Sequence, residues 1–323
     1  MNNNDIVSLP KEQERGKAAR FLKKNVPCWL YIVPVVAGII FFTILPMITS
    51  LVYAFRGYYN PEFRGDDKAG GFSFSNFSYF FTPGTAYGMN TFFTSLGVTF
   101  GFTILSLALQ ILGSYTVALF LNQHTKGIKA FRIIYYLPNL IPAVAGTMLW
   151  ANMTSTQGGY LNTLLELVGL PPYTWYESSA SVLPTLLFVN VFSWGGTAIM
   201  WLAQMQNIPP EMYESADLDG ANYFHKTFKI TIPMSTAMMF YVIVTSMIGG
   251  IQAFTNVKPL YDKFQEPNLN FIVVYIYDLA FGTIENGMSK ACALSWILFL
   301  IISLMTLVLF KTSKKWVYYG EEA

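Results

Sequence analysis

Few residues in this 323-residue chain could carry out acid–base, nucleophilic or metal chemistry. The two histidines, His124 and His225, lie far apart and have no metal-ligand spacing. The two cysteines, Cys28 and Cys292, form no CxxC pair and lie in or beside apolar runs, so we interpret them as small apolar fillers. No phosphate-binding G-x-x-x-x-G-K-S/T loop is present. We therefore expect no catalytic residue, metal site or cofactor in this chain. Any ATP that drives it must bind to another chain.

A conspicuous group of charged side chains is the stretch EMYESADLDGANYFHKTFKITIP at 211–233, here called the charged block, which lies between two long apolar runs. It holds four carboxylates and two lysines. Pro209 and Pro210 precede it, and proline is favoured where a helix starts. We expect Glu211 and Glu214 in the first helical turn, where the helix dipole favours negative charge.

The second half of the charged block predicts a turn and another helix. Gly220 can take a left-handed conformation that ends the first helix, and Asn222 can cap the second. Phe224, Phe228 and Ile232 recur at i, i+4 and i+8, which places an apolar face against lipid or other helices. This pattern predicts a projecting knob that docks a partner. An ordinary polar loop is the alternative.

The elements that position the charged block follow from composition. Hydrophobic residues make up 53% of the chain and charged residues 12%, which indicates an all-α integral membrane protein. Six segments reach the ~20 residues needed to cross the hydrocarbon layer, and each must be helical because lipid offers no partner for free amide groups. These segments are 29–55, 91–121, 133–153, 182–205, 233–257 and 291–310. We expect their prolines, Pro34, Pro46, Pro138, Pro142 and Pro184, to be tolerated as kinks.

Lysine and arginine positions predict the orientation, because cytoplasmic loops carry an excess of both. Of the 20 in the chain, 14 fall in the N-terminal tail, the loop after the second segment, the charged block and the C-terminal end. We therefore expect a multi-pass protein of the cell membrane with both termini on the cytoplasmic side.

The net charge of +2 does not favour a nucleic-acid partner. The expected domains are a basic tail at 1–28, a six-helix membrane domain at 29–311 and a C-terminal tail at 312–323. Two short apolar stretches, 159–170 and 270–281, are expected as outer-surface helices that lie against the bundle.

The six segments contain no Asp, Glu, Lys or His, and Arg132 lies at an edge. An ionisable residue inside the membrane is the usual mark of a proton relay, so its absence argues against a proton-driven carrier. A sodium-coupled carrier built from carbonyls and hydroxyls remains an alternative. A membrane scaffold that transports nothing is a second alternative.

The charged block resembles the EAA loop of ABC importer permeases, whose pattern is E-A-A, three positions, G, and a terminal L-P. Serine replaces the middle alanine and isoleucine the final leucine. The matching residues are Glu214, Ser215, Ala216, Asp219, Gly220, Ala221, Ile232 and Pro233. The resemblance implies the ABC-importer permease fold and a coupling loop at 206–232 that slots into a cytoplasmic ATPase, with Glu211 included in the contact. It also implies a second homologous permease, two ATPase subunits that bind ATP and magnesium, and an extracellular solute-binding protein.

Other stretches narrow the resemblance to carbohydrate-uptake permeases of the maltose, glycerol-phosphate and oligosaccharide type. They are FRIIYYLPNLIPAVAGTMLW at 131–150, VNVFSWGG at 189–196 and YIYDLAF at 275–281, and they look like the first of the two permease subunits. Many such permeases carry Gly-Gly-Pro after the fifth span, where this chain has QEPN at 265–268. Contact with the binding protein is therefore expected to differ there.

Sugars are held by hydrogen bonds to their hydroxyls and by aromatic faces. In sugar permeases of this type, parts of the fourth and fifth spans line a site near the membrane midplane. The corresponding candidates here are Asn190, Trp194, Ser246, Gly250, Gln252 and Asn256. Hydrogen bonds between helices and close helix packing are the alternative role for each of them.

Overall fold

The computed structural model describes residues 31–56, 71–85, 87–123 and 126–318. The predicted tail at 1–28, Cys28 and His124 lie outside these residues. The described part is almost entirely helical, and its β structure is one isolated bridge between Arg56 and Phe72. The α-helices are α2 (Leu45–Ala54), α3 (Ser75–Ser78), α4 (Met89–Leu121), α5 (Ile128–Tyr136), α6 (Ala143–Met153), α7 (Tyr160–Leu167), α8 (Ser179–Asn190), α9 (Gly195–Gln206), α10 (Pro210–Leu218), α11 (Tyr223–Lys226), α12 (Ile232–Met234), α13 (Thr236–Ile251), α14 (Lys258–Phe264), α15 (Ile272–Phe281) and α16 (Gly287–Ser313). The short π and 3-10 segments are η1 (Ile40–Ile44), η2 (Tyr79–Phe81), η3 (Leu137–Leu140), η4 (Val191–Ser193), η5 (Thr227–Thr231) and η6 (Pro267–Leu269).

Among the described residues, three continuous helices are long and apolar enough to cross a membrane: Tyr31–Ala54, which includes η1 and α2, then α4 and α16. Three helix pairs qualify only when each bent pair counts as one span. They are Ile128–Leu140 with Ala143–Met153, bent by 94°, Ser179–Ser193 with Gly195–Gln206, bent by 48°, and Tyr223–Met234 with Thr236–Ile251, bent by 61°. The prediction of six helical spans is thus confirmed in part, because half of them are broken.

The third span differs most from its prediction as one kinked helix over 133–153. Ile141 has an extended backbone, with ψ at 127°, because the ring of the following Pro142 disfavours helical geometry there. The chain therefore breaks into two helices. In the fourth span Pro184 lies inside α8, and the 48° bend comes later, at Trp194.

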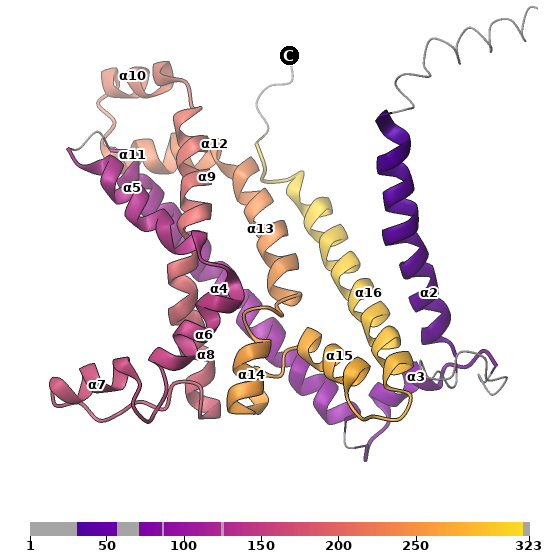
Figure 1. Ribbon diagram of the computed structural model, residues 1–323. Helices are drawn as coiled ribbons and strands as arrows, with labels where there is room; N and C mark the ends of the chain where they lie inside the picture. Colours follow the sequence, from indigo (N-terminus) through magenta and orange to yellow (C-terminus); the bar gives the residue numbers. More distant parts are fainter. Residues whose placement is uncertain (1–30, 57–70, 86, 124–125, 319–323) are drawn as a thin grey trace, which may run out of the picture.

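Helix α4 packs against α8, α9, α13 and α15 (Figure 1). Its contact with α13 is close, because a Cβ on Gly250 would lie 2.8 Å from Cγ2 of Thr103. Buried hydroxyls on α4 have hydrogen-bond partners: Thr103 donates to the carbonyl of Thr99 at 2.7 Å, and Thr99 Oγ1 accepts from the amide of Ile272 at 2.9 Å. The bond from Ile272 to Thr99 fixes the start of α15 against α4.

The two short apolar stretches have different positions. The 270–281 stretch forms a short helix against the bundle as expected: Ile272, Val274 and Leu279 of α15 are fully buried against α4 and α16, whereas Phe281 is 70% exposed. Helix α7 is a short helix as expected, but Figure 1 shows it extending away from the bundle. Its Leu167 is 78% exposed.

The two ends of the bundle carry different elements (Figure 1). Helix α10 lies at the same end as the start of the first described helix and the last turns of α16, whereas α3, α7, α14 and α15 lie at the opposite end.

Candidate functional site

The charged block folds as its local signals predict. Pro210 is the first residue of α10, Glu211 lies in the first turn, and Gly220 has a φ of +75° after the helix ends. The side chain of Asn222 caps α11 by accepting from the amide of His225 at 2.9 Å. Glu214 is the exception, because it lies in the second turn of α10 and not in the first.

Most of α10 is open to solvent. Its predicted coupling residues Glu211, Glu214 and Ser215 are exposed, as are Asp219 and Gly220 in the turn. Leu218 is 90% exposed. Ala216 and Ala221 are half-buried. The block therefore presents carboxylates and an apolar side chain together on one projecting helix.

A second candidate site is a cavity of about 360 Å³ between α6, α8, η4 and the segment after α13, here called the aromatic cavity. No charged side chain of the described residues lines it. The polar lining residues are Thr147, Asn190, Ser193, Thr255 and Asn256, and the aromatic ones are Phe102, Trp150, Tyr176 and Phe192. Trp150 and Phe192 have ring centroids 5.1 Å apart. Aromatic faces beside amides and hydroxyls form a surface suited to a sugar.

The breaks in the third and fourth spans meet beside this cavity. In the orientation that matches its neighbours, the Asn139 amide donates to the carbonyl of Ser193 at 2.9 Å and accepts from the amide of Gly196 at 2.6 Å. A Cβ on Gly195 would lie 2.5 Å from the carbonyl of Tyr135. Asn139 therefore satisfies backbone groups that the bend in the fourth span leaves without helical partners.

The six predicted pathway residues separate into two groups. Asn190 and Asn256 come together as lining of the aromatic cavity. Trp194 lies outside the lining: its Nε1 donates to Asn190 Oδ1 at 3.0 Å, and its ring packs so closely on α4 that a Cβ on Gly113 would lie 1.9 Å from it. Trp194 thus positions Asn190.

The other three candidates are on or after α13, outside the lining of the aromatic cavity. Gly250 packs against Thr103, Gln252 is exposed, and Ser246 is half-buried. The lining residues that sequence reasoning missed include Thr147, Trp150, Tyr176 and Thr255. For the first two, the stripe of Ala143, Gly146, Thr147 and Trp150 at helical spacing was an available signal.

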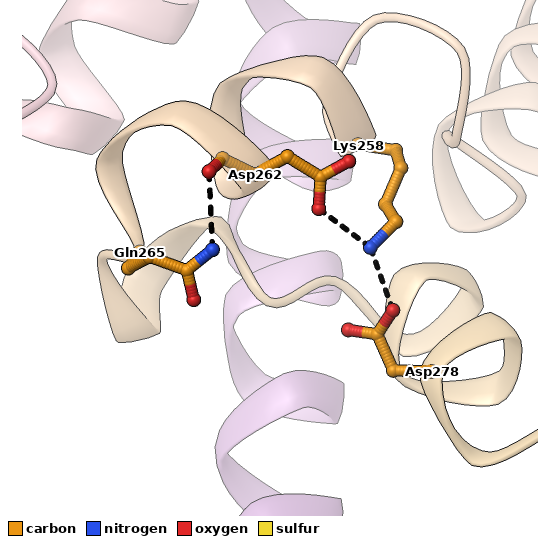
Figure 2. A network of polar contacts seen from close by, with 4 residues as sticks. All are labelled: Lys258, Asp262, Gln265 and Asp278. Carbon is orange, nitrogen blue, oxygen red and sulfur yellow. Dashed lines mark hydrogen bonds and ion pairs between the residues drawn. The ribbon is translucent and has the colours of Figure 1, made fainter. Parts of the chain in front are cut away.

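At the far end from α10, α14 and η6 form a tied segment, residues 258–269, here called the α14 segment. Figure 2 shows the Lys258 ammonium between Asp262 and Asp278, at 2.7 and 2.6 Å. Burial lowers the pKa of Lys258, whereas its hydrogen bonds to the two carboxylates raise it, and the net pKa lies above the usual lysine value. Lys263 donates to the carbonyl of Ala151 at 2.9 Å and so holds the end of α6.

The QEPN sequence belongs to this segment. Gln265 has a left-handed backbone with a φ of 53°. Glu266 accepts a hydrogen bond from Ser179, and Asn268 donates to the carbonyl of Ser179 at 2.9 Å. These bonds attach the loop to the start of α8.

No protein-family model matches the chain. The chain is 32% identical over 313 residues to the probable ABC transporter permease protein YesP of Bacillus subtilis, a match that covers 94% of this chain and 95% of YesP. The chain belongs to the family of ABC importer permeases. It is also 28% identical to the arabinooligosaccharides transport system permease protein AraP of Bacillus subtilis, over 93% of each chain. The maltodextrin transport system permease protein MdxF of the same organism is 28% identical, with 88% of this chain and 68% of MdxF covered.

Solved structures agree on the fold of this permease. A chain of a bacterial alginate ABC transporter in complex with an alginate pentasaccharide-bound periplasmic protein superposes with a TM-score of 0.81 at 22% identity, over 94% of this chain and 99% of that one. A chain of a bacterial ABC transporter involved in alginate import gives a TM-score of 0.78 at 21% identity, over 91% and 99%. The predicted resemblance to ABC importer permeases is confirmed, and these relatives give no support to a sodium-coupled carrier that works alone.

Proposed function

We propose that this permease moves a sugar or oligosaccharide into the cell and that the charged block couples it to a cytoplasmic ATPase. The aromatic cavity supplies this chain's part of the sugar site, with Asn190 and Asn256 as hydrogen-bonding groups and Trp150 as a stacking face. The names of AraP and MdxF, which refer to arabinooligosaccharides and maltodextrin, support the sugar assignment.

The observation that carries this proposal is the continuity between the two sites. The chain runs from α10 through α11, η5 and α12 into α13, and from there directly to Thr255 and Asn256 at the aromatic cavity. A displacement of α10 by a bound ATPase is therefore transmitted to the cavity along one bent span.

The proposed assembly follows from this arrangement. A second, homologous permease completes the pathway, and two ATPase subunits bind ATP and magnesium beneath it. A solute-binding protein delivers the sugar from outside, and the complex lies in the cell membrane with both termini of this chain on the cytoplasmic side. Closure of the ATPases moves the charged block and switches the spans from inward to outward access.

The test is reconstitution of the full complex in liposomes, after a thermal-shift screen of its binding protein against sugars identifies the ligand. We expect uptake of that sugar to require ATP, the ATPases and the binding protein. Accumulation of the sugar without any ATPase subunit would contradict the proposal.

A further inference from the structure

Four side chains join α10 to the start of the fifth span in a closed ring, here called the α10 ring: Tyr213, Asp217, Lys226 and Thr231. Tyr213 and Asp217 are four residues apart and so lie on the same face of α10. Lys226 and Thr231 are five residues apart and bracket the π-helix η5. The Lys226 ammonium lies 2.7 Å from Asp217 Oδ1, and the Tyr213 hydroxyl lies 3.0 Å from Thr231 Oγ1.

The ring closes through the backbone of η5. Thr231 Oγ1 donates to the carbonyl of Lys226 at 3.3 Å, so the Tyr213 hydroxyl donates to Thr231. Lys226 is therefore held at its ammonium by Asp217 and at its carbonyl by Thr231. A π-helix bonds each amide to the carbonyl five residues back, as Ile232 does to Thr227, and these side-chain bonds add to that ladder.

The position of Asp217 indicates that the ring has a purpose beyond local helix stability. Asp217 lies in the last turn of α10, where the helix dipole disfavours a negative charge. An ion pair with one partner 60% exposed stabilises the fold only weakly, so stability alone does not account for the carboxylate. The pair does fix the angle between α10 and η5, which the left-handed turn at Gly220 would otherwise leave to a few backbone bonds.

Among the described residues, α10 has little other attachment to the bundle. Tyr213 and Ala216 are its half-buried residues, and the rest of Pro210–Leu218 is exposed. Thr231, by contrast, is 4% exposed, and its carbonyl accepts from the Ser235 hydroxyl at 2.7 Å just before α13 begins. The ring therefore connects an exposed helix to a buried point in the fifth span.

We propose that the α10 ring is the rigid joint of this permease: Tyr213, Asp217, Lys226 and Thr231 are positioning residues that make α10 and the fifth span move as one body. The inference rests on the proposed coupling function. Without the ring, a bound ATPase moves α10 about the turn at Gly220, and α13 does not follow.

The experiment uses the full complex and needs no sugar. Cys28 and Cys292 are replaced by Ala, and Thr255→Cys places a maleimide-reactive thiol at the edge of the aromatic cavity. We expect ATP to change the labelling rate of this thiol about five-fold or more in the parent complex. Tyr213→Phe combined with Asp217→Asn should reduce that change to less than about two-fold, while the ATPases still bind and hydrolyse ATP.

Two further variants separate a joint from a merely stabilising contact. The exchanged pair Asp217→Lys with Lys226→Asp should restore the ATP-dependent labelling. Lys311→Gln removes one charge from the last turn of α16, outside the charged block, and should leave the labelling unchanged. A Tyr213→Phe, Asp217→Asn complex that keeps the full labelling change, or one that no longer binds the ATPases, would overturn the inference. Failure of the parent complex to respond to ATP would instead overturn the proposed coupling itself, and the inference with it.

Discussion

The charged block and the α14 segment lie at opposite ends of the permease and are held in different ways (Figure 1). The α14 segment is bonded to α6 through Lys263, to α8 through Asn268 and to α15 through Lys258. Helix α10 is exposed over most of its length and is held mainly through the α10 ring, to which it contributes Tyr213 and Asp217. One end is thus fastened within the chain, whereas the other keeps its polar and apolar surface free for a partner.

The largest effect is expected from a substitution at Gly220, in the turn of the charged block that follows α10. Its φ of +75° is costly for a β-branched residue, by about 1–2 kcal/mol. Gly220→Val should displace α10 and lower ATP-driven sugar uptake about ten-fold or more, with the same amount of chain in the membrane. Gly220→Asn is the matched control, because asparagine tolerates left-handed geometry, and it should stay within about two-fold. Uptake at the parent rate by the valine variant would contradict the coupling role.

Much of the structure of the charged block could be predicted from the sequence because its signals are local. Pro210 starts a helix, Gly220 ends it and Asn222 caps the next through contacts within a few residues. The placement of Glu214 in the first turn was wrong by about one residue, because Glu214 is the fifth residue of a helix that begins at Pro210. The α10 ring could not be predicted, because it depends on η5 being a π-helix.

The aromatic cavity was only partly predictable because distant segments build it. Asn190 and Asn256 were identified from the fourth span and the end of the fifth, but Trp150 and Tyr176 come from other segments. Their convergence depends on the 94° break of the third span. A proline such as Pro142 indicates a kink or a break, and tertiary contacts decide between them.

The next expected effect tests whether the cavity belongs to the sugar pathway. Trp150→Ala removes a stacking face and should raise the KM for the transported sugar about ten-fold, while ATP hydrolysis by the complex without sugar stays unchanged. Trp150→Phe keeps an aromatic face and should retain most of the affinity. Equal uptake kinetics in the alanine and parent proteins would exclude a substrate role for this cavity.

A smaller effect is expected in the α14 segment, where removal of a lysine should cost more stability than removal of a lysine in the charged block. Lys258→Met leaves Asp262 and Asp278 without their cation and should lower the free energy of unfolding by about 1–2 kcal/mol. Lys229→Met in the exposed part of η5 should change it by less than about 0.5 kcal/mol. Both are measured by thermal unfolding in detergent, and adding Asp278→Asn to Lys258→Met should recover part of the loss. Similar losses of unfolding free energy in Lys258→Met and Lys229→Met would contradict the difference between the α14 segment and the charged block.

The pH dependence of the Lys258 contribution has a definite sign. A folded pKa above the usual lysine value means that the stabilisation is complete below the unfolded pKa and is lost as the pH rises through the folded one. The difference in unfolding temperature between the parent and Lys258→Met should therefore be constant from about pH 6 to 9 and shrink above about pH 10.5. A difference that already changes near neutral pH would assign the effect to another group.

The smallest expected effect concerns Gln265, where the resemblance to sugar permeases implies the first glycine of Gly-Gly-Pro. The left-handed backbone at Gln265, with a φ of 53°, gives a physical reason for that glycine, because glycine adopts this conformation without strain. Its side chain offsets part of the cost by donating to the carbonyl of Asp262 at 3.1 Å (Figure 2). Gln265→Gly should therefore stabilise the permease by only about 0.5 kcal/mol. Glu266→Gly is the control: Glu266 has an extended backbone and accepts from Ser179, so this change should destabilise the tied end. If Gln265→Gly also lowered the unfolding temperature, the hydrogen bond to Asp262 would outweigh the backbone strain. Gln265 would then be one of the side chains that hold the α14 segment in place.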